Sequence, residues 1–340
     1  MLSDYTQMLL NGQNLSVEQT RMAIDSIISN GNSSVSSAAF LTALRMKGEV
    51  VDELVGAARA LKDRATAVQH QQPILLDTCG TGGDRGGTFN ISTTTAFVVA
   101  AGGVPVGKHG NRAVTSRSGS ADMLEALGVN IGLNETQIGR CIDTVGIGFM
   151  FAPALHPAMK TVAPVRKELG FRTIFNLLGP LCNPAGATHQ VIGVFDDKYL
   201  LPVADAARAL GISQVMVVHN ECGIDELAPI GQNYVASVRD GKLGEFSISA
   251  SNCGLKECSL SDLAGRDAET NAAISREIFE GVPGPKSDVV AMNAGLAFLL
   301  AGKVTDMAAG VQLARELITG GKAKAKLEQF IQYTRSCAHA

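Results

Sequence analysis

The sequence predicts an α/β fold in which a mostly parallel central sheet is flanked by helices and accompanied by a smaller all-helical domain. Three observations lead to this prediction. Short apolar runs alternate with helical stretches after residue 73, the first seventy residues carry helical patterns alone, and 340 residues exceed the usual size of a single domain. Two structural units that share an interface are therefore expected.

The N-terminal part of the chain is predicted to be a helical module. A hydrophobic staple and a capping box at 15–19 precede apolar residues at helical spacing over 17–28. A second helix is expected to start at Ser36 and Ser37, and a third covers 51–61. No strand is expected before residue 74.

The following part of the chain supplies the sheet. Apolar runs separated by helical stretches predict βαβ crossovers and parallel strands, expected at 74–76, 104–106, 147–151, 190–195 and 214–218. Asp240-Gly241 lies between two alternating segments, which predicts a hairpin and an antiparallel edge. The chain then returns to helices: 288–302 is apolar on all sides and should be buried, whereas 306–321 is amphipathic and stops at glycine.

Composition and charge exclude several classes of protein. With 46% hydrophobic and 18% charged residues, the chain is typical of a folded domain and not of a disordered one. The net charge of −3 and the isoelectric point near 6.1 lack the basic footprint of a protein that binds nucleic acid or an anionic membrane. No signal peptide or bilayer-spanning apolar run is visible, so a cytoplasmic protein is expected.

The seven cysteines show no CxxC pair. Cys253 and Cys258 have the spacing nearest to that of a metal site, but no histidine stands close to them in the sequence. Free thiols are therefore expected there in preference to zinc ligands.

The stretch DTCGTGGDRGGTFNIS, residues 77–92, connects an expected buried strand to a helix that ends at Gly102-Gly103. Glycines let backbone N–H groups converge on a ligand without Cβ atoms in the way, and a helix start adds unpaired donors and a positive dipole. The spacing matches neither GxxxxGK[ST] nor GxGxxG, so an ordinary nucleotide P-loop and a Rossmann turn both fit poorly. An anion-binding loop of another kind is predicted.

A second loop, GKHGNRAVTSRSGSAD, follows the expected strand at 104–106. It combines the cations Lys108, Arg112 and Arg117 with several hydroxyls before a helix capped near Ser120. In βαβ units both loops leave the carboxyl edge of the sheet, where open α/β sheets bind their ligands. Two phosphate-binding loops are therefore expected to face one crevice.

Adjacent carboxylates, Asp225 and Glu226, follow the expected strand at 214–218. Carboxylates that face phosphate-binding loops would repel the ligand unless a hard cation lies between them. This conflict predicts Mg²⁺ bound by carboxylates and by substrate oxygens. An isolated Asp-Glu pair would indicate an acidic surface turn, but the position directly after a strand favours the metal site.

These motifs are specific enough to indicate a family. DTCGTGGD, TFNIST, KHGNR, SGSADMLEALG, RTIFNLLGPLCNP and GIDE together resemble the anthranilate phosphoribosyltransferase family, and FLTALRMKGE and GVQLARELITGGKA extend the resemblance nearly from end to end. The resemblance implies transfer of the phosphoribosyl group of 5-phosphoribosyl 1-diphosphate (PRPP) to the amine of anthranilate. Diphosphate would be released, with magnesium as cofactor, in tryptophan biosynthesis.

The resemblance also implies the binding residues. Anthranilate would contact Gly80, Asn111 and Arg166, and Ser92, Asp225 and Glu226 would hold magnesium, with two ions expected per subunit. PRPP would contact Gly80, Gly83, Asp84, Thr88, Asn90, Ile91, Ser92, Thr93, Lys108, His109, Gly110, Asn111, Arg112, Ala113, Val114, Thr115, Ser116 and Ser120.

The family fold implies a division of the chain as well. A helical domain of residues 1–72 plus roughly 165–188 would lie on the anthranilate side and pair two subunits into a homodimer. An α/β domain of residues 73–164 plus 189–340 would bind PRPP. No nucleic-acid or membrane partner is expected.

The residue types support this chemistry independently. The Arg166 guanidinium can form two parallel hydrogen bonds with the carboxylate of an aromatic acid. The attacking amine already carries its lone pair, so the protein needs no nucleophile and no strong base. Catalysis would depend on positioning and on electrostatic stabilisation of the departing diphosphate, which agrees with the lack of a Ser-His-Asp or Cys-His set.

Several alternatives stay open at this stage. Nucleoside phosphorolysis would use a related scaffold, although Arg166 and Asn111 favour an aromatic carboxylate over a pyrimidine. A relative that has lost catalysis and binds nucleic acid would lack the Asp225-Glu226 pair and carry basic patches. His109 is expected to contact the ligand, and its role as a proton acceptor is open.

Two further motifs have more than one interpretation. His156 either lines the pocket or packs behind it. Asp196-Asp197 resembles the acidic ribose-binding motif of other phosphoribosyltransferases, but the Thr-Gly-rich loop that should follow is missing. A helix start is expected at this position instead.

Overall fold

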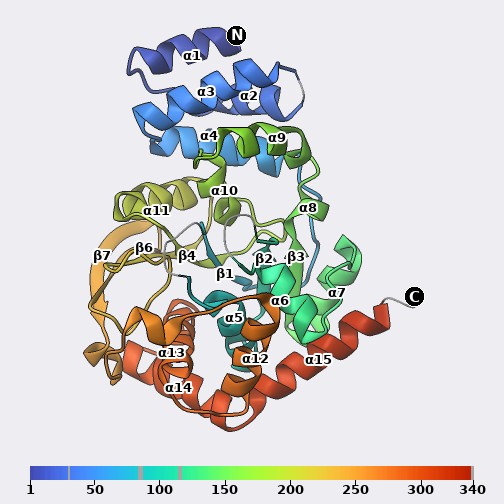
Figure 1. Ribbon diagram of the computed structural model, residues 1–340, viewed down its shortest axis with the longest axis vertical. Helices are drawn as coiled ribbons and strands as arrows, with labels where there is room; N and C mark the ends of the chain where they lie inside the picture. The colour runs from blue at the N-terminus through green and yellow to red at the C-terminus, as the bar shows by residue number, and fades with distance from the viewer. Residues whose placement is uncertain (30, 83–86, 114–116, 338–340) are drawn as a thin grey trace.

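The computed structural model describes residues 1–29, 31–82, 87–113 and 117–337. Among these residues, a helical bundle lies at one end of the molecule, and a seven-stranded sheet with its flanking helices forms the rest (Figure 1). The bundle contains α1 (Leu2–Leu10), α2 (Val17–Ile28), α3 (Ser34–Lys47), α4 (Val51–Lys62) and α9 (Met159–Leu169). The predicted fold class is confirmed.

Local sequence explains where the helices of the bundle begin. Ser16 and Gln19 form the predicted capping box: Ser16 Oγ accepts from the Gln19 amide at 3.3 Å, and the Gln19 side chain accepts from the Ser16 amide at 2.9 Å. The predicted helix start at Ser36 is wrong. Ser33 has an extended backbone, and its hydroxyl caps α3 by accepting from the Ser36 amide at 3.1 Å.

The sheet has the strand order β3-β2-β1-β4-β5-β6-β7. The first five strands in this order are parallel, and β6 and β7 are antiparallel as predicted. Asp240 and Gly241 form the hairpin turn with positive φ values of 51° and 74°. The strands are β1 (Leu76–Gly80), β2 (Val106–Gly110), β3 (Ile147–Phe151), β4 (His189–Gly193), β5 (Gln214–Asn220), β6 (Gln232–Arg239) and β7 (Lys242–Ser249).

β1 and β2 continue beyond the apolar runs that predicted them, and β4 ends earlier than predicted. The sequence obscures the true ends because Asp77 and Lys108 are polar and nevertheless buried. Partners from other elements permit this burial: Asp77 accepts from the Asn183 side chain at 2.8 Å, and Lys108 Nζ donates to the Thr78 carbonyl. Gly80 and Lys108 are therefore strand residues at the carboxyl edge, and not loop residues.

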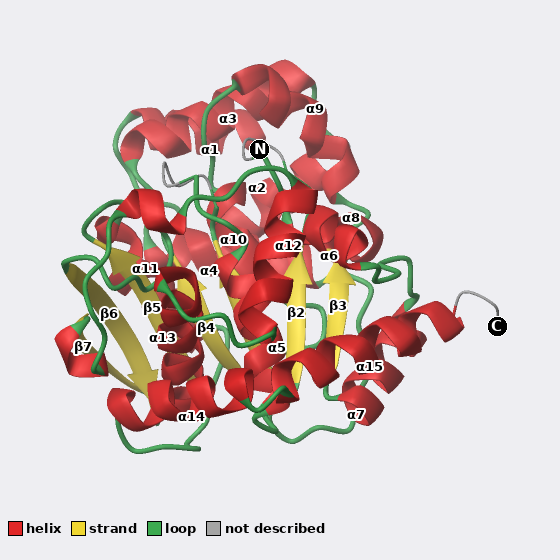
Figure 2. Cartoon of the chain, turned by 60° about the horizontal axis from the view of Figure 1, so that its bottom comes forward, coloured by secondary structure: helices red, strands yellow, loops and turns green. Residues whose placement is uncertain are grey.

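Helices cover both faces of the sheet (Figure 2). One face packs against α5 (Ile91–Ala101) and α13 (Pro285–Leu300), and α13 is buried along its length as predicted. α14 (Met307–Thr319) and α15 (Lys322–Ser336) pack against these two helices. The opposite face packs against α10 (Phe175–Leu181) and α11 (Leu200–Ala209).

The core on the α11 side continues from the sheet into the bundle. It contains Ile24, Phe40 and Leu54 of the bundle together with Val217 and Val238 of the sheet. The bundle and the sheet therefore share one hydrophobic core, and their relative position is set by packing. The division of the chain at 1–72 plus 165–188 stays a prediction.

The remaining helices complete the molecule. The Asp196 side chain accepts from the Lys198 amide at 3.3 Å, which confirms the predicted helix start. No helix in the described ranges has the length and hydropathy needed to cross a membrane. The other elements are α6 (Ser120–Leu127), α7 (Glu135–Val145), α8 (Ala152–Leu155), α12 (Ala268–Phe279), and the 3₁₀ turns η1 (Asp197–Tyr199), η2 (Ser251–Cys253) and η3 (Leu260–Leu263).

Candidate functional site

The loop after β1 and the turn after β5 meet at the carboxyl edge of the sheet. Two hydrogen bonds join them: the Gly82 amide donates to Asp225 Oδ2 at 2.7 Å, and the Ser92 amide donates to Glu226 Oε1 at 3.1 Å. The acidic turn is thus in direct contact with the glycine-rich loop and with the first turn of α5. The predicted convergence of these two motifs is what the structure shows.

Two glycines make this approach possible. A Cβ atom at Gly80 would overlap the carboxylate of Asp225, and a Cβ atom at Gly193 would overlap the Asp225 carbonyl oxygen. Asp225 therefore lies against the bare backbone of β1 and β4. Glycine is needed at position 80 because a larger residue would leave no room for the Asp225 carboxylate.

Asp225 is buried, with 8% of the residue exposed. Burial raises the pKa of its carboxyl, while the Gly82 amide and the positive charges of Arg172 and Lys108 act in the opposite direction. Lys108 is also buried, and its Nζ lies 3.5 Å from Ser92 Oγ. These cations balance part of the negative charge of the acidic turn.

Ser92, Asp225 and Glu226 offer only oxygen ligands, which suits Mg²⁺. A small cavity bordered by Thr78, Ser92 and Glu226 adjoins them. Within the described ranges, no group of three or more His, Cys, Asp or Glu side chains could hold a metal ion by itself. Two carboxylates and a hydroxyl leave the other positions of an octahedral ion to water or substrate oxygens, so the residues fit an ion that binds together with a polyphosphate.

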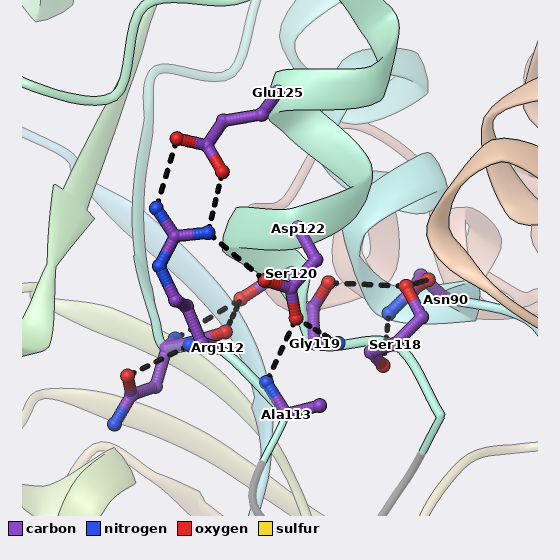
Figure 3. Close-up of polar contacts among 9 residues, drawn as sticks. Asn90, Arg112, Ala113, Ser118, Gly119, Ser120, Asp122 and Glu125 are labelled. Carbon is purple, nitrogen blue, oxygen red and sulfur yellow. Dashed lines mark hydrogen bonds and ion pairs between the residues drawn. The ribbon is translucent and has the colours of Figure 1, made fainter.

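Asn90 ties the two glycine-containing loops together (Figure 3). Its Nδ2 donates to the Ser118 carbonyl at 3.2 Å, and its Oδ1 accepts from the Ser118 hydroxyl at 3.1 Å. Asn271 Nδ2 donates to the same Oδ1 at 2.8 Å. A side chain at the start of α5 thereby sets the distance between the two loops.

The other expected PRPP contacts fall into three groups. Ile91 and Thr93 are buried in α5, and the half-buried Thr88 pairs through its backbone with Ala264. His109 and Gly110 stand at the end of β2. Five of the expected contacts lie outside the described residues: Gly83, Asp84, Val114, Thr115 and Ser116.

Several backbone amides in the described part of the second loop donate to side chains of the loop and of α6 (Figure 3). The Asn111 amide donates to Ser120 Oγ at 3.1 Å, and the amides of Ala113 and Gly119 both donate to Asp122 Oδ2 at 2.9 Å. A phosphate that binds at these residues must therefore replace an internal hydrogen bond or use a side chain.

Two buried histidines lie where β2 approaches α10. His109 Nδ1 lies 3.2 Å from the carbonyl oxygen of Gly179, which can only accept, so we assign the proton to Nδ1 and the lone pair to Nε2. The rings of His109 and His156 are 5.0 Å apart, and neither Nε2 has a hydrogen-bond partner in the described part of the chain. Burial lowers the pKa of His109 to about 3 and that of His156 to about 4, so both rings are neutral near pH 7.

Arg166 lies in the last turn of α9, and its guanidinium is 5.7 Å from the centre of the Phe175 ring. Burial lowers the pKa of Arg166, and no carboxylate among the described residues pairs with it. A half-buried guanidinium without a counter-charge suits a ligand that brings its own carboxylate.

Comparison with known proteins agrees with this geometry. The α/β domain model of a glycosyl transferase family matches residues 72–324, and the helical bundle domain model of that family matches residues 3–65. The anthranilate phosphoribosyltransferase of Petrotoga mobilis is 44% identical over 334 residues, which cover 98% of this chain and 97% of the relative. The chain belongs to the anthranilate phosphoribosyltransferase family.

Solved structures of the anthranilate phosphoribosyltransferase family share the fold. The enzyme from Thermus thermophilus has a TM-score of 0.92 at 44% identity, covering 98% of this chain and 99% of that chain. The enzyme from Saccharomyces cerevisiae in complex with PRPP and Mg has a TM-score of 0.90 at 30% identity, covering 98% of each chain. Another structure of the yeast enzyme is a complex with 4-fluoroanthranilate.

Sequence reasoning missed residues that support the site in this member of the family. Asp77 is fully buried and accepts from the His109 amide at 3.3 Å as well as from Asn183, which is 106 residues away in the chain. No local pattern predicts a contact over such a separation. Asp122 and Glu125 could have been found, because their spacing places both on one face of the helix that follows the second loop.

Proposed function

We propose that the protein transfers the phosphoribosyl group of PRPP to the amine of anthranilate and releases diphosphate, as a step of tryptophan biosynthesis. Its membership in the anthranilate phosphoribosyltransferase family supports this activity. Within the chain itself, the observation that carries the proposal is Arg166, a half-buried guanidinium without a carboxylate partner among the described residues. It favours an aromatic acid as the acceptor over a neutral nucleobase.

PRPP is proposed to bind along the carboxyl ends of β1 and β2, between the glycine-rich loop and the second loop. The proposed contacts are the residues expected from the sequence, from Gly80 to Ser120, apart from the side chain of Arg112, which is paired with Asp122 and Glu125. Lys108 is the cation of this set that points into the protein, because it is buried and its Nζ lies near Ser92 Oγ. A buried ammonium close to the helix start would stabilise the charge of the departing diphosphate.

Two Mg²⁺ ions per subunit are proposed, with Ser92, Asp225 and Glu226 as protein ligands. Bound magnesium would supply positive charge to the diphosphate leaving group. The yeast relative in complex with PRPP and Mg supports the use of magnesium by this chain. The bare backbone at Gly80 allows Asp225 to stand where such an ion and the substrate would meet.

Anthranilate is proposed to bind at Gly80, Asn111 and Arg166, with its carboxylate on the guanidinium. Nε2 of His109 can accept a hydrogen bond from an amine, because Nδ1 carries the proton and Nε2 has no partner among the described residues. Nε2 of His156 also lacks a partner there. Catalysis then consists of holding the amine near the anomeric carbon while charge develops on diphosphate. No protein nucleophile takes part.

A cytoplasmic homodimer that pairs through the helical bundle is part of the proposal. Leu10, Val35 and Met46 on α1 and α3 are 65%, 79% and 83% exposed and are therefore available to contact a second subunit. The predicted helical domain, residues 1–72 plus 165–188, would contribute the anthranilate side of each site. The α/β domain, residues 73–164 plus 189–340, would contribute the PRPP side.

The intrinsic fluorescence of anthranilate provides the test. Fluorescence should disappear only when the protein, PRPP and Mg²⁺ are all present, and a chelator should stop the loss. A nucleoside with inorganic phosphate is the matched control, from which no free base should form. Release of a nucleobase without consumption of anthranilate would overturn the proposal in favour of phosphorolysis.

A further inference from the structure

Both terminal nitrogens of Arg112 are paired with carboxylates of this chain (Figure 3). Its two terminal nitrogens bind the Glu125 carboxylate in a bidentate pair, at 2.5 Å and 2.9 Å, and one of them lies 3.0 Å from Asp122 Oδ1. The guanidinium also lies 5.5 Å from the centre of the Phe151 ring. A residue expected to bind PRPP is thus occupied by two carboxylates from one face of α6.

Asp122 accepts hydrogen bonds from the backbone as well as from the side chain of Arg112. Its Oδ2 accepts from the amides of Ala113 and Gly119, while its Oδ1 accepts from Arg112. Burial alone would raise the pKa of Asp122, but the two amides and the guanidinium outweigh it, so the pKa lies below its usual value. Glu125 and Asp122 in turn raise the pKa of Arg112, so its guanidinium stays charged at neutral pH.

The charges of the cluster argue against Arg112 as a ligand of PRPP. One cation stands against two carboxylates, so the three side chains together are negative. A guanidinium that turned to a phosphate would leave Asp122 and Glu125 without a cation close to a polyanion, at an electrostatic cost. Arg112 avoids this electrostatic cost if it stays paired with the two carboxylates and holds the loop in place.

We propose that Asp122 and Glu125 are positioning residues for PRPP binding, and that Arg112 acts through them as an internal brace instead of contacting PRPP. The brace fixes Ala113 and Gly119 relative to α6, and the Arg112 amide adds a bond to Asn111 Oδ1 at 2.7 Å. This inference rests on the proposed function, because it concerns the loop to which PRPP is assigned.

A double-mutant cycle of Arg112→Gln and Glu125→Gln tests the brace. Each single variant should raise the KM for PRPP roughly two- to fivefold, the effect of losing one partly exposed ion pair. The KM for anthranilate should change less than the KM for PRPP, because Asn111 is the one proposed anthranilate contact in this loop, whereas Gly80 and Arg166 lie on other elements. The double variant should be no worse than either single variant, because both remove the same interaction.

Several results would overturn the inference. If Arg112 contacts PRPP, Arg112→Gln should cost far more than Glu125→Gln, and the double variant should equal the product of the two effects. Single variants that both behave like the unsubstituted protein would also exclude the brace. Equal changes in KM for both substrates would indicate a general structural defect and not positioning of PRPP.

Arg315→Gln provides a matched control. Arg315 lies 2.7 Å from Asp288, and these side chains are 45% and 23% exposed, compared with 47% and 23% for Arg112 and Asp122. The control pair joins α14 to α13, away from the loop, so its loss should leave both KM values unchanged.

Two more variants separate positioning from folding. Asp122→Asn keeps an oxygen for the two amides and should raise the KM for PRPP less than Asp122→Ala does. If Arg112→Gln lowers the thermal midpoint strongly, Arg112→Lys replaces it in the cycle, since it keeps the charge and loses the bidentate geometry. An unsubstituted protein that fails to consume anthranilate would refute the proposed function. If the unsubstituted protein is active and the variants leave its KM for PRPP unchanged, only the brace is refuted.

Discussion

The two sides of the candidate site treat their polar groups in opposite ways. On the side where PRPP is proposed to bind, groups such as Asp225 and the Gly82 amide are hydrogen-bonded to each other. On the side where anthranilate is proposed to bind, Nε2 of His109, Nε2 of His156 and the guanidinium of Arg166 have no hydrogen-bond or ion-pair partner among the described residues. A ligand on the first side must therefore exchange internal bonds, whereas a ligand on the second side supplies bonds that are missing.

Exchanging one hydrogen bond for another and supplying a missing hydrogen bond contribute different free energies of binding. Replacing one hydrogen bond by another contributes only their difference, while giving a partner to a buried, unpaired polar group removes a penalty of about 1–3 kcal/mol. Recognition of a small aromatic acid can thus depend on few contacts. Binding of PRPP must depend on the sum of many contacts and on the metal.

The largest expected effect tests the PRPP side. Asp225→Asn keeps the size of the side chain but removes its charge, so kcat/KM should fall about 100- to 1,000-fold, and more Mg²⁺ should be needed for half the maximal rate. Initial rates over a series of magnesium concentrations measure the loss of kcat/KM and the Mg²⁺ concentration needed for half the maximal rate. Asp288→Asn, which alters an ion pair elsewhere, is the control. An unchanged magnesium titration would remove Asp225 from the metal site.

The next effect tests the anthranilate side. Arg166→Ala should raise the KM for anthranilate roughly 10- to 100-fold, because it removes a charge-assisted pair with the substrate carboxylate. The KM for PRPP should change far less. Lys167→Ala, in the same turn of α9 but exposed, should leave both constants unchanged. Equal effects of Arg166→Ala on both substrates would contradict the assignment.

A third substitution tests the contact that joins the glycine loop to the acidic turn. Gly80→Ala places a methyl group in the space of the Asp225 carboxylate, and the protein should lose about 1–3 kcal/mol of stability as it shifts to make room. Denaturant unfolding measures the loss. Gly244→Ala is the control, since its added Cβ would meet only Ser237 Oγ at 3.4 Å. Equal stability of the two variants would show that Asp225 moves freely.

The last test concerns the histidine pair and pH. The pKa values of His109 and His156 are lowered from 6.5 to about 3 and about 4, so between about pH 4 and 6.5 the unfolded chain binds protons that the folded chain does not. Stability should therefore fall as pH decreases below 6.5, by roughly 1 kcal/mol per histidine and pH unit. Denaturant unfolding at several pH values measures this slope.

The variant His109→Asn/His156→Asn serves as the reference for that slope. It lacks both titrating rings, so its stability should depend less on pH over the same range. Parallel slopes for the two proteins would mean that the rings are protonated in the folded state, and that the pair is not the neutral acceptor described above.

Much of the fold could be predicted because its signals are local. The Ser16–Gln19 capping box and the Asp240-Gly241 turn each depend on residues within a few positions, and both form as predicted. The ends of β1 and β2 could not be predicted in this way. Asp77 and Lys108 join those strands because distant partners compensate the cost of burying them.

In the candidate site, too, local motifs could be predicted and contacts between distant residues could not. The glycine loop and the acidic turn were found from composition and spacing, and the Gly82–Asp225 bond across 143 positions brings them together. Sequence analysis singled out His109 and His156 separately, but no local pattern indicated that they would form a buried pair. Its unpaired Nε2 atoms result from the packing of α10 and neighbouring segments around β2.

The sequence by itself determined the family, the fold class and the kinds of groups that surround the ligands, because motifs and helix caps are written in neighbouring residues. Only the tertiary structure decided which polar groups are already paired and which still lack a partner. Pairing depends on burial and on contacts between residues far apart in the chain, such as Asp77 with Asn183, and these exist only once the whole core has formed.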